Sequence, residues 1–338
     1  MTEVLILIIS AAVGFLSVEL VRRWGLRRQV LDIPNERSSH TSPVPRAGGI
    51  GIVATVMIGY IVGSVISGYA ISWGFLLGGL LVAGVSFVDD LRGLPFYIRL
   101  FAHSIAAALV ISDSGPIVEI SYLLGKGSIT LGFFSIPITF GAILWVINAY
   151  NFMDGIDGIA GLQAVVAAVG WFVFALITGT DDVKWLSIAV GGASIGFLFL
   201  NRSPARIFMG DVGSAFLGFV FAAFPLIALK SPSTPAGIVP MFAALVVFPF
   251  LFDTIFTLFR RLFNQEKVWK AHRSHIYQRM VINGATHTSV TLLYGFLAAI
   301  TTVAAITLIV RSEIAEVLAV SSVSMVSAFL LWMATKKH

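Results

Sequence analysis

The sequence predicts an all-α integral membrane protein that forms a single polytopic membrane domain over residues 1–338. Hydrophobic residues make up 57% of the chain and charged residues only 12%, whereas soluble domains contain about 25% charged residues. Apolar stretches recur along the whole length, and most are close to the roughly 20 residues that cross a bilayer as a helix. The chain has no cysteine, which excludes disulfides, thiolate nucleophiles and cysteine-ligated metals.

We expect about 11 transmembrane helices, each bounded by polar residues. The first is interpreted as a retained span, because Glu3 precedes it and a basic cluster follows it, the reverse of a cleaved signal peptide. The stretches 97–112 and 185–200 are among the shortest. The expected spans are residues 4–21, 47–67, 71–88, 97–112, 131–148, 159–178, 185–200, 212–229, 237–257, 288–310 and 314–334.

The basic residues predict that the N-terminus lies outside and the C-terminus inside the membrane. In this orientation the inner segments carry 18 of the 22 Lys and Arg residues, in agreement with the positive-inside rule. In the outer stretch 115–130, Gly125-Lys126-Gly127 separates two β-prone runs, which predicts a small outer β-hairpin. The inner segments are residues 22–46, 89–99, 201–211, 258–287 and 335–338.

Five carboxylates fall at the inner ends of the expected spans. Ionisable groups at the edge of the hydrocarbon are costly and usually mark a site. The simpler alternative is that they are ordinary helix-end residues in contact with water. Their arrival at one membrane depth from three separate segments favours a shared site instead. They are Asp89, Asp90, Asp154, Asp157 and Asp211.

Asp89 and Asp90 are adjacent, so on a regular helix their side chains point about 100° apart and cannot both chelate one ion. We therefore expect a division of labour, in which one faces the reacting centre and the other positions groups or binds metal. Arg99 follows at the inner start of the next span, where it could hold an anion.

Polar residues recur at every third position from Asn148 through Asn151 and Asp154 to Asp157. On a straight helix the first and last would face opposite ways, so the chain must break for them to converge. Glycines at 155, 158 and 161 make this easy, and we expect a helix end near 151–158. Oxygen ligands from Asn and Asp suit Mg²⁺, with Mn²⁺ as the alternative, rather than zinc.

The inner loop 258–287 contains two histidines and two arginines close together, which favours a phosphate or nucleotide clamp. They are His272, Arg273, His275 and Arg279. The alternatives are a topogenic basic loop near anionic lipid and a zinc site through the two histidines. On the same face, the Pro and Gly residues of the segment 39–49 could merely shape a turn, or together with Arg46 this segment could form a wall of the site.

These motifs together resemble the polyprenyl-phosphate N-acetylhexosamine-1-phosphate transferases, the bacterial glycosyltransferase family 4. The resemblance covers residues 35–280, with the motifs in the same order and on one membrane face. The motifs are Pro45-Arg46-Ala47-Gly48-Gly49, Asp89-Asp90, Asn151-x-x-Asp154-x-x-Asp157, Gly210-Asp211-Val212-Gly213-Ser214 and the segment 271–279, here called the histidine loop.

The resemblance implies that undecaprenyl phosphate attacks the β-phosphorus of a UDP-N-acetylhexosamine, giving undecaprenyl-diphosphate-sugar and UMP with Mg²⁺. It implies a bacterial cytoplasmic-membrane enzyme whose site faces the cytoplasm and binds no nucleic acid; a homodimer is compatible with it. By the same resemblance, Asp211 and Asn151 hold the metal, Asp157 meets the uridine and Asp154 supports the pocket. Asp89 and Asp90 orient or deprotonate the lipid phosphate, and the phosphate or sugar contacts are Arg46, Arg99, His272, Arg273, His275 and Arg279.

One motif departs from the family. Many relatives carry His-Ile-His-His where this chain has His275-Ile276-Tyr277-Gln278. The variant is similar to the branch that initiates O-antigen synthesis, whose donors include N-acetylfucosamine and N-acetylquinovosamine nucleotides. Two other classes compete with the transferase: a membrane transporter, which would place its polar groups near the midplane, and a lipid-diphosphate phosphatase, which would release inorganic phosphate.

Overall fold

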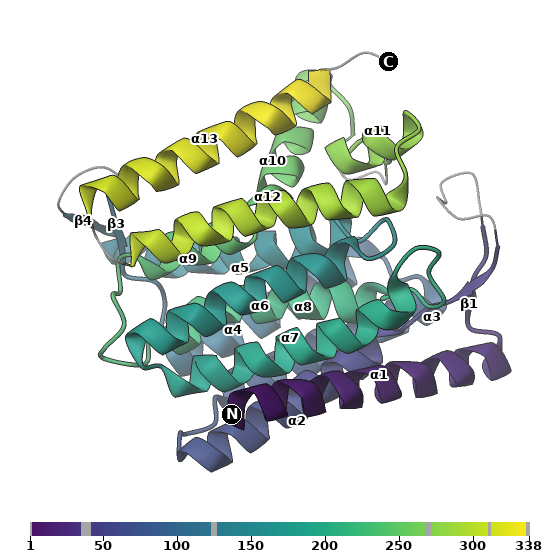
Figure 1. Cartoon of the computed structure of the whole chain (residues 1–338), viewed down its shortest axis with the longest axis horizontal. Helices are drawn as coiled ribbons and strands as arrows, with labels where there is room; N and C mark the ends of the chain where they lie inside the picture. Colours follow the sequence, from purple (N-terminus) through teal and green to yellow (C-terminus); the bar gives the residue numbers. More distant parts are fainter. Residues whose placement is uncertain (1, 35–41, 123–126, 268–271, 310–311, 336–338) are drawn as a thin grey trace.

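The computed structural model describes residues 2–34, 42–122, 127–267, 272–309 and 312–335, which form one bundle of long helices (Figure 1). In these residues, ten helices are long and apolar enough to cross a membrane, and a bent helix pair is an eleventh candidate. This confirms the all-α membrane fold, including the short spans at 97–112 and 185–200. The long helices are α1 (Thr2–Arg28), α2 (Gly49–Ser67), α3 (Trp73–Arg92), α4 (Phe96–Ser114), α5 (Ser135–Phe152), α6 (Ile159–Thr178), α7 (Asp181–Asn201), α8 (Asp211–Ala228), α12 (His287–Leu308) and α13 (Glu313–Thr335).

The expected span 237–257 is not one straight helix. It consists of α9 (Val239–Val246) and α10 (Phe248–Phe263), which meet at an angle of 79°. The break lies at Val247, and Pro249 stands in the first turn of α10. Proline has no backbone N–H to continue the hydrogen bonds of the preceding helix, so the second half turns away and extends to Phe263.

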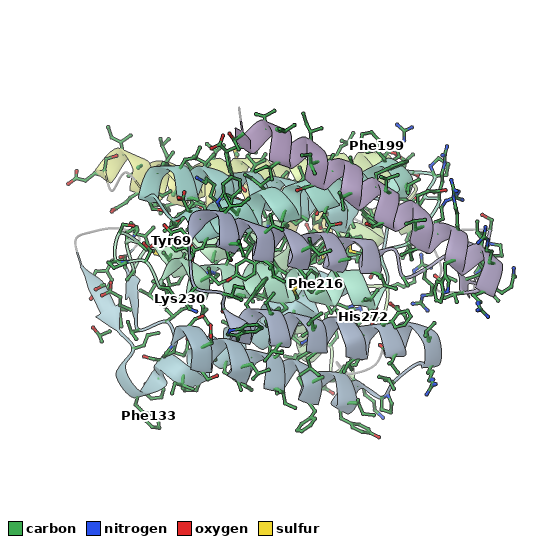
Figure 2. The ribbon with its side chains drawn as sticks, turned by 90° about the horizontal axis from the view of Figure 1, so that it is seen from below. Tyr69, Phe133, Phe199, Phe216, Lys230 and His272 are labelled. Atoms are coloured by element: carbon green, nitrogen blue, oxygen red, sulfur yellow. The ribbon has the colours of Figure 1, made fainter. Side chains whose placement is uncertain are left out.

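Different short elements lie at the two ends of the bundle. The strands β3 (Glu119–Ser121) and β4 (Ser128–Thr130) pair antiparallel, which confirms the expected hairpin; Gly125 and Lys126 lie outside the described residues. In Figure 1 these strands lie at the end where α1 begins, whereas α13 ends at the other. Figure 2 likewise shows Tyr69 and Lys230 toward one end and His272 toward the other. The remaining elements are β1 (Leu31–Asp32), β2 (Val44–Pro45), the 3₁₀ turn η1 (Gly132–Phe134) and α11 (Ile276–Ile282).

Helix α8 is the centre of the bundle. In its apolar stretch 94% of the residues are buried, against 11% in α1, which lies at the rim. The N-terminal end of α8 packs against α2 through two glycines, because a Cβ on Gly49 would overlap the backbone of Gly213. The same contact is fixed by the Gly49 N–H, which donates to the Met209 carbonyl at 2.8 Å. Small residues therefore bring the 45–49 segment directly onto the start of α8.

We expect Gly49→Ala to destabilise the protein, because the added methyl group has no space at the α2–α8 crossing. Overpacking of this kind costs about 1–3 kcal/mol, so the thermal midpoint in detergent should fall by several degrees. Gly84→Ala on α3 is the matched control, since a Cβ there meets no atom within 4 Å. Equal midpoints for the two variants would contradict the close packing described above.

Candidate active site

The carboxyl group of Asp90 joins three segments at one end of the bundle. Asp90 stands near the end of α3 and is buried. Its oxygens accept the backbone N–H groups of Asp211 and Val212, both at 3.0 Å, and the Arg46 guanidinium lies 3.3 Å away. A carboxyl group at a helix N-terminus satisfies N–H groups that have no partner within the helix and interacts favourably with its dipole. Asp90 therefore fixes the start of α8.

The chain before Asp211 is shaped for this contact. Gly210 has φ +73°, and a Cβ on it would overlap the Asp90 carboxyl group, so both conformation and space require glycine. Upstream, the Phe208 N–H donates to the Pro45 carbonyl at 2.8 Å and the Gly48 N–H to the Phe208 carbonyl at 2.9 Å. The loop that carries Arg46 thus pairs with the loop that carries Asp211.

Arg99 connects Asp89, the other acid of α3, with Asp211, the first residue of α8. Its guanidinium lies 2.7 Å from Asp89 and 2.9 Å from Asp211. The Leu94 N–H also donates to Asp89, which holds this side chain at the turn after α3. Asp89 and Asp90 therefore face different partners, as their helical spacing predicts. The arginine offsets the repulsion between two carboxylates that would otherwise lie unpaired side by side.

The helix break expected near residues 151–158 is confirmed. Helix α5 ends at Phe152 and α6 begins at Ile159, with Gly158 at φ +79° between them. The Gly158 N–H donates to the Asn201 side chain at 2.8 Å, which anchors the turn to α7. On the last turn of α5, the Asn151 amide donates to Ser214 of α8 at 3.0 Å. Asn151 and Asp211 therefore lie on adjoining helix ends.

Asp157 is held in its charged form from several sides. Its carboxylate accepts the Ala205 N–H at 3.2 Å and lies 3.3 Å from His287 Nδ1. Burial favours the neutral acid, but hydrogen bonds from His287 and Ser203 outweigh it, so the pKa of Asp157 is lowered. His287 stands 130 residues away in the sequence. No motif pointed to it, because only the fold brings the start of α12 to this turn.

Asp154 has the opposite electrostatic environment. Asp154 and Asp157 both line the first of the two cavities described below. Part of the Asp154 surface is accessible, but protein atoms surround it closely. This burial, and next the charge of Asp211 and Asp90, raises the pKa of Asp154 well above its usual range. Two carboxylates three residues apart thus differ in their preferred protonation state, which is a common feature of functional sites.

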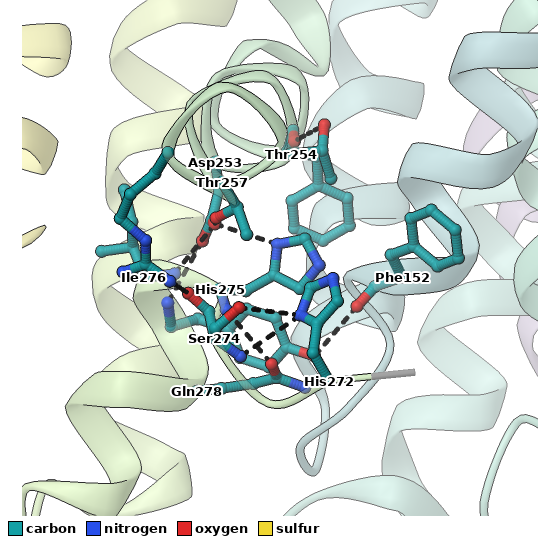
Figure 3. Close-up of polar contacts among 12 residues, drawn as sticks. Phe152, Asp253, Thr254, Thr257, His272, Ser274, His275, Ile276 and Gln278 are labelled. Atoms are coloured by element: carbon teal, nitrogen blue, oxygen red, sulfur yellow. Dashed lines mark hydrogen bonds and ion pairs between the residues drawn. The ribbon is translucent and has the colours of Figure 1, made fainter. Parts of the chain in front are cut away.

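The histidine loop is anchored by a buried acid in the bent helix, as Figure 3 shows. Asp253 of α10 is 0% exposed. It accepts the Ile276 N–H at 2.9 Å and the Tyr277 N–H at 3.1 Å, and its Oδ1 lies 3.2 Å from His275 Nδ1. Tyr294 of α12 donates to it at 2.6 Å and Thr257 at 3.2 Å. Asp253 was not predicted from the sequence, because one acid within an apolar run gives no periodic pattern.

The predicted residues of the loop do not all face the same space. Arg273 lines the first cavity described below, and His272 and His275 line the second. Burial, and next the neighbouring His275, lowers the pKa of His272 to about 4, so this imidazole is neutral at pH 7. Arg279 lies elsewhere: it donates to the Ala334 carbonyl at the end of α13 at 2.7 Å, and it lines neither cavity.

Two cavities meet at this end of the bundle. The first, of about 290 Å³, is lined by residues that include Arg46, Asp154, Asp157 and Arg273. The second, of about 340 Å³, opens among α3, α4 and α5 and includes Arg99 and the two histidines. Both are lined by Asn151, Asp211 and Gln278. A group bound in one cavity can therefore approach a group bound in the other at Asn151 and Asp211.

The oxygen atoms at this meeting point fit a magnesium ion better than zinc. Within the described ranges, no three His, Cys, Asp or Glu side chains are grouped so as to hold a metal by themselves. Mg²⁺ is typically held by one or two carboxylates together with substrate phosphates and water. Asp211 and Asn151 can supply such a partial set, whereas structural zinc needs about four protein ligands.

We expect Asp253→Asn to destabilise the protein and release the histidine loop, because an amide has one acceptor oxygen and would turn its NH₂ group toward the donors. Disrupting a buried pair of this kind costs about 3 kcal/mol or more. Thermal unfolding in detergent, with hydrogen exchange of the Ile276 and Tyr277 amides, measures both effects. Asp181→Asn is the control, since Asp181 is 43% exposed on the surface of α7. Protection and midpoints equal to the control would refute the anchoring role.

Comparison with known proteins supports an enzymatic site. A family model described as glycosyl transferase family 4 matches residues 72–229. A probable undecaprenyl-phosphate N-acetylglucosaminyl 1-phosphate transferase of Bacillus subtilis is 29% identical, over 88% of this chain and 83% of the relative. The undecaprenyl-phosphate alpha-N-acetylglucosaminyl 1-phosphate transferase of Yersinia pestis is 26% identical, over 89% and 82%.

A decaprenyl-phosphate N-acetylglucosaminephosphotransferase of Mycobacterium leprae is 30% identical, over 84% of this chain and 78% of the relative. The matched family region runs from the start of α3 to the end of α8, and so includes Asp89, Asp90, Asn151 and Asp211. The matches with these relatives also cover most of each relative's own length. The chain therefore belongs to the polyprenyl-phosphate N-acetylhexosamine-1-phosphate transferase family, as its motifs indicated.

Proposed function

We propose that this multi-pass membrane enzyme transfers an N-acetylhexosamine 1-phosphate from a UDP-sugar to undecaprenyl phosphate on the cytoplasmic face of the inner membrane. The observation that carries the proposal is the meeting of two cavities at Asn151 and Asp211. One substrate of such a reaction is water-soluble and the other lies in the bilayer, so their reacting phosphates must meet at an interface. The inner assignment of this end follows from the basic residues that the sequence concentrates there.

In the proposed reaction an oxygen of the lipid phosphate forms a bond to the β-phosphorus of the donor. The bond from that phosphorus to the bridging oxygen breaks, and UMP leaves with the electron pair. A phosphate monoester is largely ionised at pH 7 because its second pKa is near 6, so it needs little base catalysis. The main barrier is the approach of two anions, which positive charge and positioning relieve.

The donor is assigned to the first cavity. Asp157, kept ionised by His287, is placed to accept hydrogen bonds from the uridine, and Asp154 supports this pocket from within. Arg46 and Arg273 line the same space and can offset the diphosphate charge. Asp211 with Asn151 would hold Mg²⁺, with Mn²⁺ as the alternative; when bound, the ion supplies charge neutralisation at the diphosphate.

The two acids at the end of α3 are assigned different roles. Asp90 positions the start of α8, because its oxygens are used by the N–H groups of Asp211 and Val212. Asp89 shares Arg99 with Asp211, and it is proposed to orient the lipid phosphate through that arginine. This division follows from the different partners of the two carboxyl groups.

The sugar is proposed to be of the O-antigen-initiating type, such as N-acetylfucosamine or N-acetylquinovosamine. The proposal rests on the variant sequence His275-Ile276-Tyr277-Gln278 described above. Its two variant positions differ in exposure. Tyr277 is buried, and its hydroxyl donates to the Phe152 carbonyl at 3.0 Å, whereas Gln278 lines both cavities. Gln278 is therefore the better placed of the two to contact a sugar.

Replacement of Asp89, Asp90 or Asp211 by Asn should reduce UMP release by at least about a hundredfold. Asp89 and Asp211 lie at the reacting centre, and Asp90 holds the start of α8, and with it Asp211, in place. Purified protein is incubated with undecaprenyl phosphate and a panel of UDP-sugars, with and without Mg²⁺, and UMP is quantified by chromatography. Asp181→Asn, far from the site, serves as the control.

Near-normal UMP release from all three variants would overturn the assignment of these carboxylates. Release of inorganic phosphate from a lipid diphosphate in place of UMP would favour the phosphatase. Metal-dependent uptake of a radiolabelled solute into proteoliposomes, without UMP release, would favour a transporter.

A further inference from the structure

The second cavity contains buried polar groups that the site described above does not use. His103 of α4 is 4% exposed and Ser86 of α3 is 1% exposed, and both side chains line this cavity. Among the described residues, the two ring nitrogens of His103 and the hydroxyl of Ser86 have no hydrogen-bond partner. Buried polar groups in proteins are nearly always paired. These three unpaired atoms belong to two side chains that line one cavity, so a polar ligand in that cavity could supply the missing partners.

The helical spacing places these groups beside the reacting centre. His103 is one turn beyond Arg99 on α4, so both side chains lie on the same face of that helix. Ser86 is about one turn before Asp89 and Asp90 on α3. Asn151 and Asp211 line the same cavity. A ligand held by His103 and Ser86 would therefore lie next to Arg99 and the meeting point of the two cavities.

The rest of the cavity wall identifies the kind of ligand. Phe96, Leu100 and Phe152 line it, and these side chains are 60%, 41% and 51% exposed on the surface of the helices that cross the membrane. A ligand that reaches His103 from the bilayer would pass along these apolar residues with a hydrocarbon chain. Its head group would share Arg99 with Asp89 and Asp211 and would meet the donors of His103 and Ser86. An arginine together with such hydrogen-bond donors is the chemistry that binds a phosphate.

We propose that the second cavity binds the phosphate of the lipid acceptor, and that His103 and Ser86 donate hydrogen bonds to it. Even a neutral imidazole carries one N–H group, and a serine hydroxyl can turn toward an acceptor. The inference rests on the proposed function and adds to it the binding site of the acceptor. His103 and Ser86 do not line the first cavity, so their contribution is confined to the acceptor side.

The test compares the two substrates in variants of α3 and α4. His103→Ala is expected to raise the KM for undecaprenyl phosphate about ten- to a hundredfold, the effect of losing a hydrogen bond to a charged group, and to leave the KM for the UDP-sugar unchanged. His103→Gln retains an N–H donor and should keep the acceptor KM within a few fold of wild type. Ser86→Ala, a smaller change that preserves the fold, should raise it several fold.

Ser104→Ala is the matched control on α4, because the Ser104 hydroxyl donates to the Leu100 carbonyl of its own helix and lines neither cavity. Binding gives a second readout: farnesyl phosphate should raise the thermal midpoint of wild type and Ser104→Ala, but not of His103→Ala. Farnesol, which lacks the phosphate, should have no comparable effect on any of them.

The inference is overturned if wild type forms UMP and lipid-linked sugar while His103→Ala and Ser86→Ala keep the wild-type acceptor KM. In that case the buried groups hold ordered water. It is also overturned if the two KM values rise together. Absence of lipid-linked product from wild type with every UDP-sugar would instead defeat the proposed function. If His103→Ala does not fold, the acceptor KM of Ser86→Ala decides the question.

Discussion

The carboxyl group of Asp90, buried against the start of α8, is the contact on which the site depends. It receives two backbone N–H groups and lies beside Arg46, so it joins α3, α8 and the loop before α2. Burial of a polar group is costly unless such partners are present. With α8 fixed in this way, Asp211 meets Arg99 from one side and Asn151 adjoins it from another. The two cavities therefore share one point at which their occupants can react.

Much of this arrangement could be predicted from the sequence, because the bilayer imposes simple rules. The length of the apolar stretches located the spans, including the short ones at 97–112 and 185–200. The three-residue spacing from Asn148 to Asp157, with its glycines, required the helix end that the structure has at Phe152. Ionisable residues at span ends marked Asp89, Asp90 and Asp211, since acids are rare so close to the hydrocarbon.

The residues that sequence reasoning missed act through contacts between distant segments. Asp253 and His103 each stand alone within an apolar run, where a single polar residue gives no pattern. His287 follows a loop and contacts Asp157 only through the packing of α12 against α6. The bend at Val247 was missed because α9 and α10 together have the length and hydropathy of one span. Such features depend on tertiary contacts, whereas span length and charge alternation do not.

We propose that Asp211 and Asn151 hold a divalent ion against the donor diphosphate, and the assignment of the two cavities depends on this. Electron paramagnetic resonance of Mn²⁺ added to the purified protein with UDP-sugar tests it directly. We predict one bound ion with ³¹P hyperfine coupling from the donor, lost in Asp211→Asn and retained in the surface variant Asp181→Asn. An identical Mn²⁺ spectrum and affinity in Asp211→Asn, or a bound ion without phosphorus coupling, would contradict the account.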